Sequence, residues 1–132
     1  IGLSPAETER EHVEVYELPL EYQDVIIYTG QGYPGRDILL TRTSDAVILG
    51  CGRIGTIHEF TVAFEDHKPI GILTGDWLTD ETLKLIIERG RRPNDKIVFS
   101  DNPKELVAKM IEMVQAEKDR IAEAPISALS AK

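Results

Sequence analysis

A chain of 132 residues is about one domain long, enough to bury roughly two-thirds of the surface that its unfolded form exposes. Hydrophobic residues make up 42% of it, but no apolar run reaches the ~20 residues of a membrane helix, which excludes a membrane-spanning protein. The net charge of −8 argues against nucleic-acid binding and the single cysteine against an intrachain disulfide, so we expect a cytoplasmic protein.

Two strands and a helix are predicted in the first third of the chain. The chain begins with Ile1 rather than Met, and residues 1–5 read like a buried strand entering a loop. We therefore expect a strand–helix unit to be missing from its N-terminus. A short β-branched run at 24–30 predicts the next buried strand. A loop over 31–35 and a helix from Arg36 are expected after it.

The middle of the chain predicts a strand, a glycine loop, a helix and another strand. Residues 46–49 are continuously apolar, as in a parallel strand covered by helices on both faces. They run directly into the loop at 50–56. The apolar residues after Gly55 favour a buried helix that ends near 66–67. A further apolar run at 69–73 predicts the next strand.

Two more helices are predicted around a last strand. We expect Thr79 to cap a helix that Gly90 ends in the left-handed conformation. Residues 96–99 then predict a strand. Asn102, followed by Pro103 at the first helical position, is a strong start for the final helix.

The alternation of short apolar strands with longer helices indicates βαβ units. The predicted fold is therefore α/β, a Rossmann-like three-layer sandwich with a mostly parallel sheet. Residues 1–124 are expected to form a single nucleotide-binding domain, incomplete at its N-terminus, and residues 125–132 a flexible tail.

The glycine loop is the predicted ligand site. In open parallel sheets, ligands bind beyond the carboxyl ends of the strands, where helix N-termini present free N–H groups. Gly50, Gly52 and Gly55 would allow a backbone to approach a phosphate closely, and Thr56 could cap the helix or donate to a phosphate oxygen. These glycines satisfy G-x-G-x-x-G, but they follow a middle strand and Asp76 lies in a loop, which disfavours a dinucleotide. A plain turn is the alternative.

Residues 51–59, C-G-R-I-G-T-I-H-E, resemble the P-G-G-x-G-T-x-x-E motif of the LOG family, the nucleoside 5′-monophosphate phosphoribohydrolases. Residues 44–48 resemble the strand that leads into this motif. Arg36 precedes Asp45 by nine residues, the spacing of the family's essential arginine. Residues 67–73 resemble the next strand of that family, and residues 98–106 resemble its last strand and helix. The resemblance covers nearly the whole chain and extends to the compact bacterial members and the molybdenum-cofactor carrier proteins.

The resemblance implies hydrolysis of the N-glycosidic bond of a nucleoside monophosphate, which yields free base and ribose 5-phosphate. Glu59 would stabilise the oxocarbenium-like ribose or orient water, and Arg36 would hold the phosphate or ribose or assist departure of the base. The implied phosphate ligands are Gly50, Gly52, Arg53, Gly55 and Thr56. No metal or cofactor is expected. The implied partners are a phosphorylated small molecule and a second copy of the chain. The apolar helices around Phe60 and Phe64 could pair across a two-fold axis.

One departure from the motif affects the function. Where the family has Pro-Gly-Gly, this chain has Cys51-Gly52-Arg53. If that backbone needs positive φ, Arg53 costs on the order of 1 kcal/mol, but its side chain could instead point at a phosphate. Three functions stay open: a phosphoribohydrolase, a non-catalytic carrier or sensor of a nucleotide or a molybdopterin-type cofactor, and a dimeric scaffold whose ligand site has decayed.

The remaining reactive or aromatic side chains are interpreted as structural. We expect Cys51 to be an inert buried thiol and His58 to lie on a helix surface, outside the reaction. His12 and His67 are expected in loops. Trp77 is expected to cover the edge of the core, with stacking on a base as the alternative.

Overall fold

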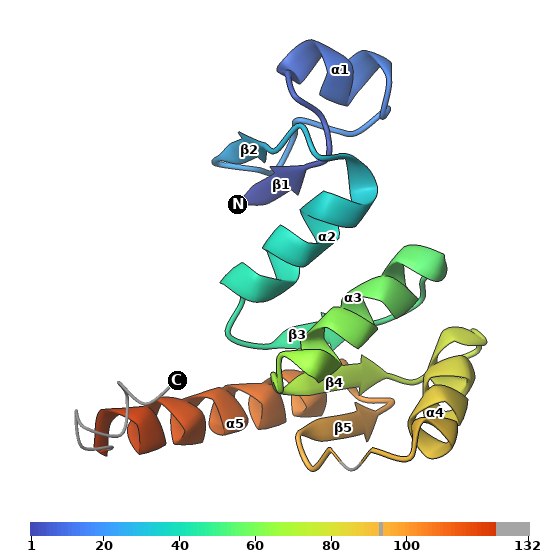
Figure 1. Cartoon of the computed structure of the whole chain (residues 1–132), viewed down its shortest axis with the longest axis vertical. Helices are drawn as coiled ribbons and strands as arrows, with labels where there is room; N and C mark the ends of the chain where they lie inside the picture. The colour runs from blue at the N-terminus through green and yellow to red at the C-terminus, as the bar shows by residue number, and fades with distance from the viewer. Residues whose placement is uncertain (93, 124–132) are drawn as a thin grey trace.

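The computed structural model describes residues 1–92 and 94–123, so the predicted flexible tail lies outside the described part. Strands and helices alternate along it (Figure 1). The elements are β1 (Gly2–Ser4), α1 (Glu9–Glu14), β2 (Ile26–Tyr28), α2 (Gly32–Thr43), β3 (Val47–Leu49), α3 (Ile54–Glu65), β4 (Ile70–Leu73), α4 (Thr79–Gly90), β5 (Ile97–Ser100) and α5 (Pro103–Glu123). This alternation confirms the predicted α/β class. Among the described helices, none combines the length and the hydropathy of a membrane span.

The strands pair in parallel, but in two sheets. β1 pairs with β2, and β4 lies between β3 and β5, with Ile70 opposite both Val47 and Ile97. Helix α2 contacts both β1 and α3 and so connects the two sheets (Figure 1). Parallel pairing was predicted, whereas the division into two sheets was not, because a hydrophobic run identifies a strand without saying which edges pair.

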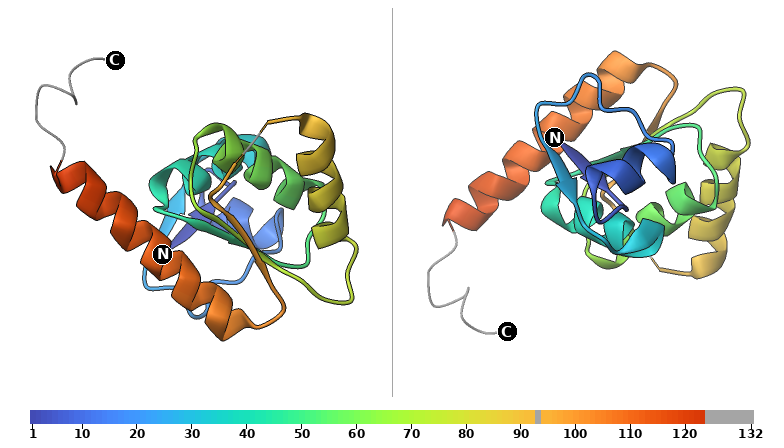
Figure 2. Two further views of the ribbon diagram at one scale, coloured as in Figure 1. Left: turned by 90° about the horizontal axis from the view of Figure 1, so that it is seen from below. Right: turned by 90° about the horizontal axis from the view of Figure 1, so that it is seen from above.

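Helices cover both faces of the three-stranded sheet. On one face α5 contacts β4 and β5, and Gly71 leaves room for it, because a Cβ there would lie 3.0 Å from Met110 Cγ. Helices α3 and α4 contribute to the core on the other face, and Figures 1 and 2 show α5 on the side away from them. The buried core consists of Leu49, Phe60, Ala63, Ile70, Ile72 and Leu83. Burial of each large side chain contributes about 1.5–3 kcal/mol. This core therefore fixes the positions of β3 and α3, which flank the loop at 50–53.

Helix α1 was not predicted, and it corrects the interpretation of His12. Thr8 caps it by accepting a hydrogen bond from Glu11 N. His12 is only 3% exposed, and its ring contacts Ser4 Oγ at 2.8 Å and the Pro19 carbonyl at 3.1 Å. A helix of six residues is too short to show a periodic apolar pattern, which explains the error.

Helix α2 begins at Gly32, four residues before the predicted start at Arg36. The predicted loop at 31–35 is therefore mostly the first turn of a helix. Pro34 lies within that turn, where the missing N–H of proline removes no helical hydrogen bond. The shift places Arg36 in the second turn of α2, on a rigid element.

The ends of the last two helices were predicted with mixed success. Thr79 is the first residue of α4 and does not cap it. Arg91, with φ of 53°, takes the left-handed conformation that was expected of Gly90. Asn102 caps α5 as predicted, because its Oδ1 accepts hydrogen bonds from the backbone N–H groups of Lys104 and Glu105. His67 lies in a turn, as expected.

Candidate functional site

A cavity of about 570 Å³ brings together parts of α2, α3 and the loop before α3. It is lined by Tyr33, Arg36, Asp37, Arg53, Ile54, Gly55, Thr56 and Glu59. Five of the predicted site residues are among them: Arg36, Arg53, Gly55, Thr56 and Glu59. Small-molecule sites typically enclose about 300–1,000 Å³, so the cavity has room for a nucleotide-sized ligand.

The other two predicted ligand residues do not line this cavity. Gly50 follows the end of β3, and Gly52 lines an adjoining cavity of about 370 Å³ together with Trp77 and Thr79. Arg53 lines both cavities. The predicted phosphate loop is therefore divided, with its second half facing the larger cavity.

Gly52 shapes the loop rather than the larger cavity. A Cβ on Gly52 would lie 1.8 Å from Thr56 Oγ1, so only glycine fits there. Gly52 N donates a hydrogen bond to Thr79 Oγ1 at 3.1 Å, and the same hydroxyl donates to Gly52 O at 2.9 Å. Thr79, only 8% exposed, thus holds the loop instead of capping α4. Arg53 has φ of −121°, an extended conformation, so the strain considered from the sequence is absent.

The first turn of α3 presents its N–H groups to the larger cavity. The helix begins at Ile54, and Thr56 lies inside its first turn, so Thr56 does not cap it. Arg53 is the N-cap residue and makes no side-chain cap hydrogen bond, and the first turn holds no acidic residue. By contrast, acidic residues occupy the first turns of α1, α4 and α5. The N–H groups and positive dipole end of α3 therefore favour an anion.

Four charged or ionisable side chains meet at one side of the cavity. Arg36 Nη1 lies 3.7 Å from Glu59 Oε1, and Arg36 Nε lies 3.2 Å from Asp37 Oδ1. Asp37 Oδ2 lies 3.1 Å from His58 Nδ1. The Arg36 guanidinium also lies 5.7 Å from the centroid of the Tyr33 ring, a cation–π distance. We call Arg36, Asp37, His58 and Glu59 the charged cluster.

The pKa of Glu59 is raised above the ordinary value of 4.5. Burial is the largest cause, and the nearby charge of Asp37 adds to it, while Arg36 and His58 lower the pKa and offset part of the effect. The folded protein thus holds the Glu59 proton more tightly than the unfolded chain does. Stability is therefore lost as pH rises from 4.5 through the raised pKa, because Glu59 must then ionise in a partly buried place.

Sequence reasoning missed Asp37. Asp37 is 3% exposed and is the residue that contacts both Arg36 and His58. His58 was expected on a helix surface, outside the reaction; its side chain is 37% exposed and does not line the cavity, but its ring pairs with Asp37. Nothing in the hydrophobic pattern distinguishes Asp37 from a surface charge. The only sequence feature that could have indicated them is adjacency: Asp37 follows Arg36, and His58 precedes Glu59.

Cys51 and Trp77 lie on the other side of the loop. Cys51 is exposed, so the expectation of a buried thiol is wrong. Trp77 is half-buried and lines the 370 Å³ cavity. Its ring lies over Gly75, where a Cβ would come within 2.7 Å of it. A side chain at position 75 would therefore displace the ring.

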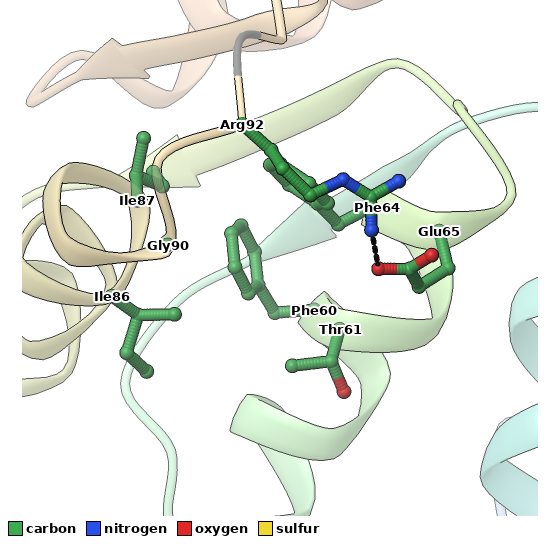
Figure 3. Close-up of a pocket in the computed structure, with 8 residues that line it drawn as sticks. All are labelled: Phe60, Thr61, Phe64, Glu65, Ile86, Ile87, Gly90 and Arg92. Carbon is green, nitrogen blue, oxygen red and sulfur yellow. Dashed lines mark hydrogen bonds and ion pairs between the residues drawn. The ribbon is translucent and has the colours of Figure 1, made fainter.

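A third cavity, of about 230 Å³, lies between α3 and α4 (Figure 3). Its lining is mainly apolar, and Arg92 lies at its rim, paired with Glu65 and 5.8 Å from the Phe64 ring centroid. It adjoins the C-terminal halves of both helices, where the dipole disfavours anions. Phe60 is 1% exposed and belongs to the core of this chain, so it offers no surface to a second copy. Homodimerisation stays a prediction.

Comparison with known proteins identifies the family of this chain. A family model described as LDcluster4, the SLOG cluster4 family, matches residues 1–107. This segment runs from β1 into α5 and contains every residue that lines the 570 Å³ cavity. No curated protein and no solved structure matches the chain. Within the described residues, no group of three or more His, Cys, Asp or Glu side chains could hold a metal ion.

Proposed function

This chain belongs to the SLOG cluster4 family, within a superfamily that includes LOG-like proteins, and we propose that it is a nucleotide-binding phosphoribohydrolase. Its substrate would be a nucleoside 5′-monophosphate, and its products a free base and ribose 5-phosphate. The observation that supports this most directly is the 570 Å³ cavity, because it joins an anion-binding helix end to Arg36 and Glu59.

The phosphate would bind at the first turn of α3. There it would accept hydrogen bonds from the free N–H groups of Ile54, Gly55 and Thr56, with Arg53 close to it at the mouth of the cavity. The ribose would then lie toward Glu59, which is five residues further along the same helix. A negative phosphate at the helix end and a developing positive charge near Glu59 match the polarity of the site.

The proposed reaction needs water and one carboxylate. The C1′–N bond breaks, its electron pair goes to the base, and the ribose gains positive charge that an ionised Glu59 stabilises. Water attacks C1′ and forms the new C–O bond. Its proton passes to Glu59 or to solvent, and the base takes up a proton as it leaves. The Arg36 guanidinium, whose Nη1 lies 3.7 Å from Glu59 Oε1, would place a positive charge beside that carboxyl.

The direct test is incubation of the full chain with each common nucleoside 5′-monophosphate, followed by chromatography. We expect equimolar base and ribose 5-phosphate from at least one of them. A thermal-shift measurement with the same compounds reports binding separately. Saturable binding without any product would reject hydrolysis and leave the second candidate.

The second candidate is a non-catalytic carrier or sensor of a nucleotide or a molybdopterin-type cofactor, and Arg53 favours it. This residue lies between the two adjoining cavities and is exposed, so its charge is available to a phosphate group that extends toward either one. Tight binding of a phosphorylated ligand needs only that charge and the N–H groups of α3. Chromatography after incubation separates this candidate from the hydrolase.

Replacing Gly55 with Ala should weaken ligand binding while the protein becomes no less stable. A Cβ at Gly55 would stand in the cavity, 3.9 Å from Asp37 Oδ2, and would separate a phosphate from the α3 backbone. In a helix, Ala is more favourable than Gly by up to about 1 kcal/mol. We expect at least a tenfold rise in Kd by calorimetry, with an unchanged or higher Tm.

Gly90→Ala is the matched control for this change. Gly90 ends α4, and a Cβ there would meet nothing within 4 Å. Its affinity for the nucleotide should equal that of the wild type. If Gly55→Ala bound the nucleotide as tightly as Gly90→Ala, the phosphate would not lie against the first turn of α3.

A further inference from the structure

Asp37 occupies the centre of the charged cluster. It is almost fully buried, and its two carboxylate oxygens have separate partners: Oδ1 lies 3.2 Å from Arg36 Nε and Oδ2 lies 3.1 Å from His58 Nδ1. Arg36 in turn lies 3.7 Å from Glu59. Because Arg36 and Asp37 are neighbours on α2, and His58 and Glu59 are neighbours on α3, these contacts close a ring between the two helices.

We infer that Asp37 and His58 are positioning residues, which fix Arg36 and set the electrostatic environment of Glu59; their role in turnover rests on the proposed function. His58 holds the Asp37 carboxylate from α3, and Asp37 holds the Arg36 guanidinium from α2. Neither is assigned a contact with the substrate: Asp37 lines the cavity, but its two oxygens are paired with Arg36 and His58, and His58 is not among the lining residues.

The burial of Asp37 supports this role. A carboxylate taken out of water is strongly disfavoured unless charged or hydrogen-bonding groups surround it, so Asp37 depends on Arg36 and His58 as its partners. The Arg36 guanidinium has the Tyr33 ring on a second side, 5.7 Å from the ring centroid. These two contacts favour one orientation of the guanidinium toward Glu59. Catalytic rates are sensitive to such placement, since a shift of about 1 Å can lower them about 100-fold.

The charges of Asp37 and His58 act on Glu59 in opposite directions. The charged groups that face the Glu59 carboxyl are Asp37 and Arg36 from α2 and His58 from its own helix. Asp37 raises the pKa of Glu59, whereas a protonated His58 lowers it. The ring thus balances two acidic groups against two basic ones. Removing the charge of Asp37 should therefore shift the pKa of Glu59 in one direction, and removing that of His58 should shift it in the other.

Two substitutions remove the charge of Asp37 or of His58 while keeping the approximate shape of the side chain. Asp37→Asn keeps the shape of the side chain and removes its negative charge, so the pKa of Glu59 should fall. His58→Asn can still donate to Asp37 Oδ2 from its amide but cannot become positive, so the pKa of Glu59 should rise further. A purely structural role for these residues predicts no such opposite displacement.

The experiment is an NMR titration of the Glu59 side-chain carboxyl in the ligand-free full chain, which needs no turnover. The matched controls are Asp80→Asn and His67→Asn. Asp80 is 5% exposed and pairs with Lys84 at 3.8 Å on α4, and neither Asp80 nor His67 lines the 570 Å³ cavity. Both controls should leave the Glu59 titration where the wild type has it.

Kinetic measurements then test positioning. We expect His58→Asn to retain kcat within about tenfold at the optimum pH, because the hydrogen bond to Asp37 survives. His58→Ala, which loses that bond, should lower kcat about 100-fold with little change in KM. Equal kcat values for His58→Asn and His58→Ala would overturn the positioning role.

The outcomes separate this inference from the proposed function. Opposite displacements of the Glu59 titration in Asp37→Asn and His58→Asn support the electrostatic part, even if no nucleotide is hydrolysed and the proposed reaction fails. Displacements in the same direction, or none, overturn it, even if the wild type hydrolyses a nucleotide. Should Asp37→Asn fail to fold, an upward displacement in His58→Asn alone supports the inference, and no displacement in that variant overturns it.

Discussion

Replacing Glu59 with Gln should abolish release of the base while nucleotide binding is retained. The amide has nearly the shape of the carboxyl group but cannot become negative, so it cannot stabilise the positive ribose or accept a proton. Loss of such a group typically lowers rates about 10²- to 10⁴-fold. Chromatography gives the rate of base release, and calorimetry gives the nucleotide Kd, which should stay within about threefold of the wild type.

Glu65→Gln is the matched control, because Glu65 lies on the same helix, pairs with Arg92 and does not line the 570 Å³ cavity. This variant should release base at the wild-type rate. A Glu59→Gln variant with unchanged turnover would contradict the assigned role. A variant that loses binding as well as turnover would instead show that Glu59 holds the ligand.

The same substitution should make the protein more stable at neutral pH. The pKa of Glu59 is raised mainly by burial, so the ionised side chain lowers stability once the pH exceeds the raised value. Gln carries no such charge. The stability advantage of Glu59→Gln over the wild type should therefore be present at pH 7 and disappear below the ordinary value of 4.5. Urea unfolding at several pH values measures it.

Gly52→Ala should damage both the fold and the site. Its Cβ would lie 1.8 Å from Thr56 Oγ1 and 2.6 Å from Thr56 Cβ, so either the loop or the first turn of α3 must move. Overpacking of this kind typically costs about 1–3 kcal/mol. Movement of the loop would also break the two hydrogen bonds with Thr79. We expect a lower urea midpoint and at least a tenfold weaker nucleotide affinity.

Gly50→Ala provides the contrast, because a Cβ at Gly50 meets nothing within 4 Å and its φ is not in the left-handed region. Its stability and affinity should match the wild type within about 0.5 kcal/mol. If Gly50→Ala were as damaging as Gly52→Ala, the two glycines would serve one shared turn. The requirement for glycine would then not be confined to Gly52, as its contact with Thr56 indicates.

Local patterns predicted the order of most elements correctly. Apolar runs of three to five residues identified β3, β4 and β5, and Asn102 with Pro103 identified the start of α5. These predictions were correct because burial of a strand and capping of a helix depend on a few adjacent residues. The error at α1 follows from its length of six residues, whereas those at the start of α2 and at Thr79 occur where a distant part of the chain supplies the hydrogen bond.

The site was predicted in part for the same reason. The resemblance indicated Glu59 by its place in the motif and Arg36 by its spacing of nine residues before Asp45, and the structure places Arg36 Nη1 3.7 Å from Glu59 Oε1. Asp37 and His58 carry no such local signal. Asp37 is one of many acidic residues in the sequence, and only its burial between two helices sets it apart.

By itself, the sequence determined that the chain folds into alternating strands and helices, with a glycine loop placed before a helix. Those features follow from hydrophobic spacing and backbone conformation, which act over a few residues. Only the tertiary structure decided that α2 lies against α3, which assembles the charged cluster, and that Gly52 faces Thr56 while Gly55 faces the cavity. Such contacts join residues more than twenty positions apart, or depend on which way a helix face is turned, and neither is encoded in a local pattern.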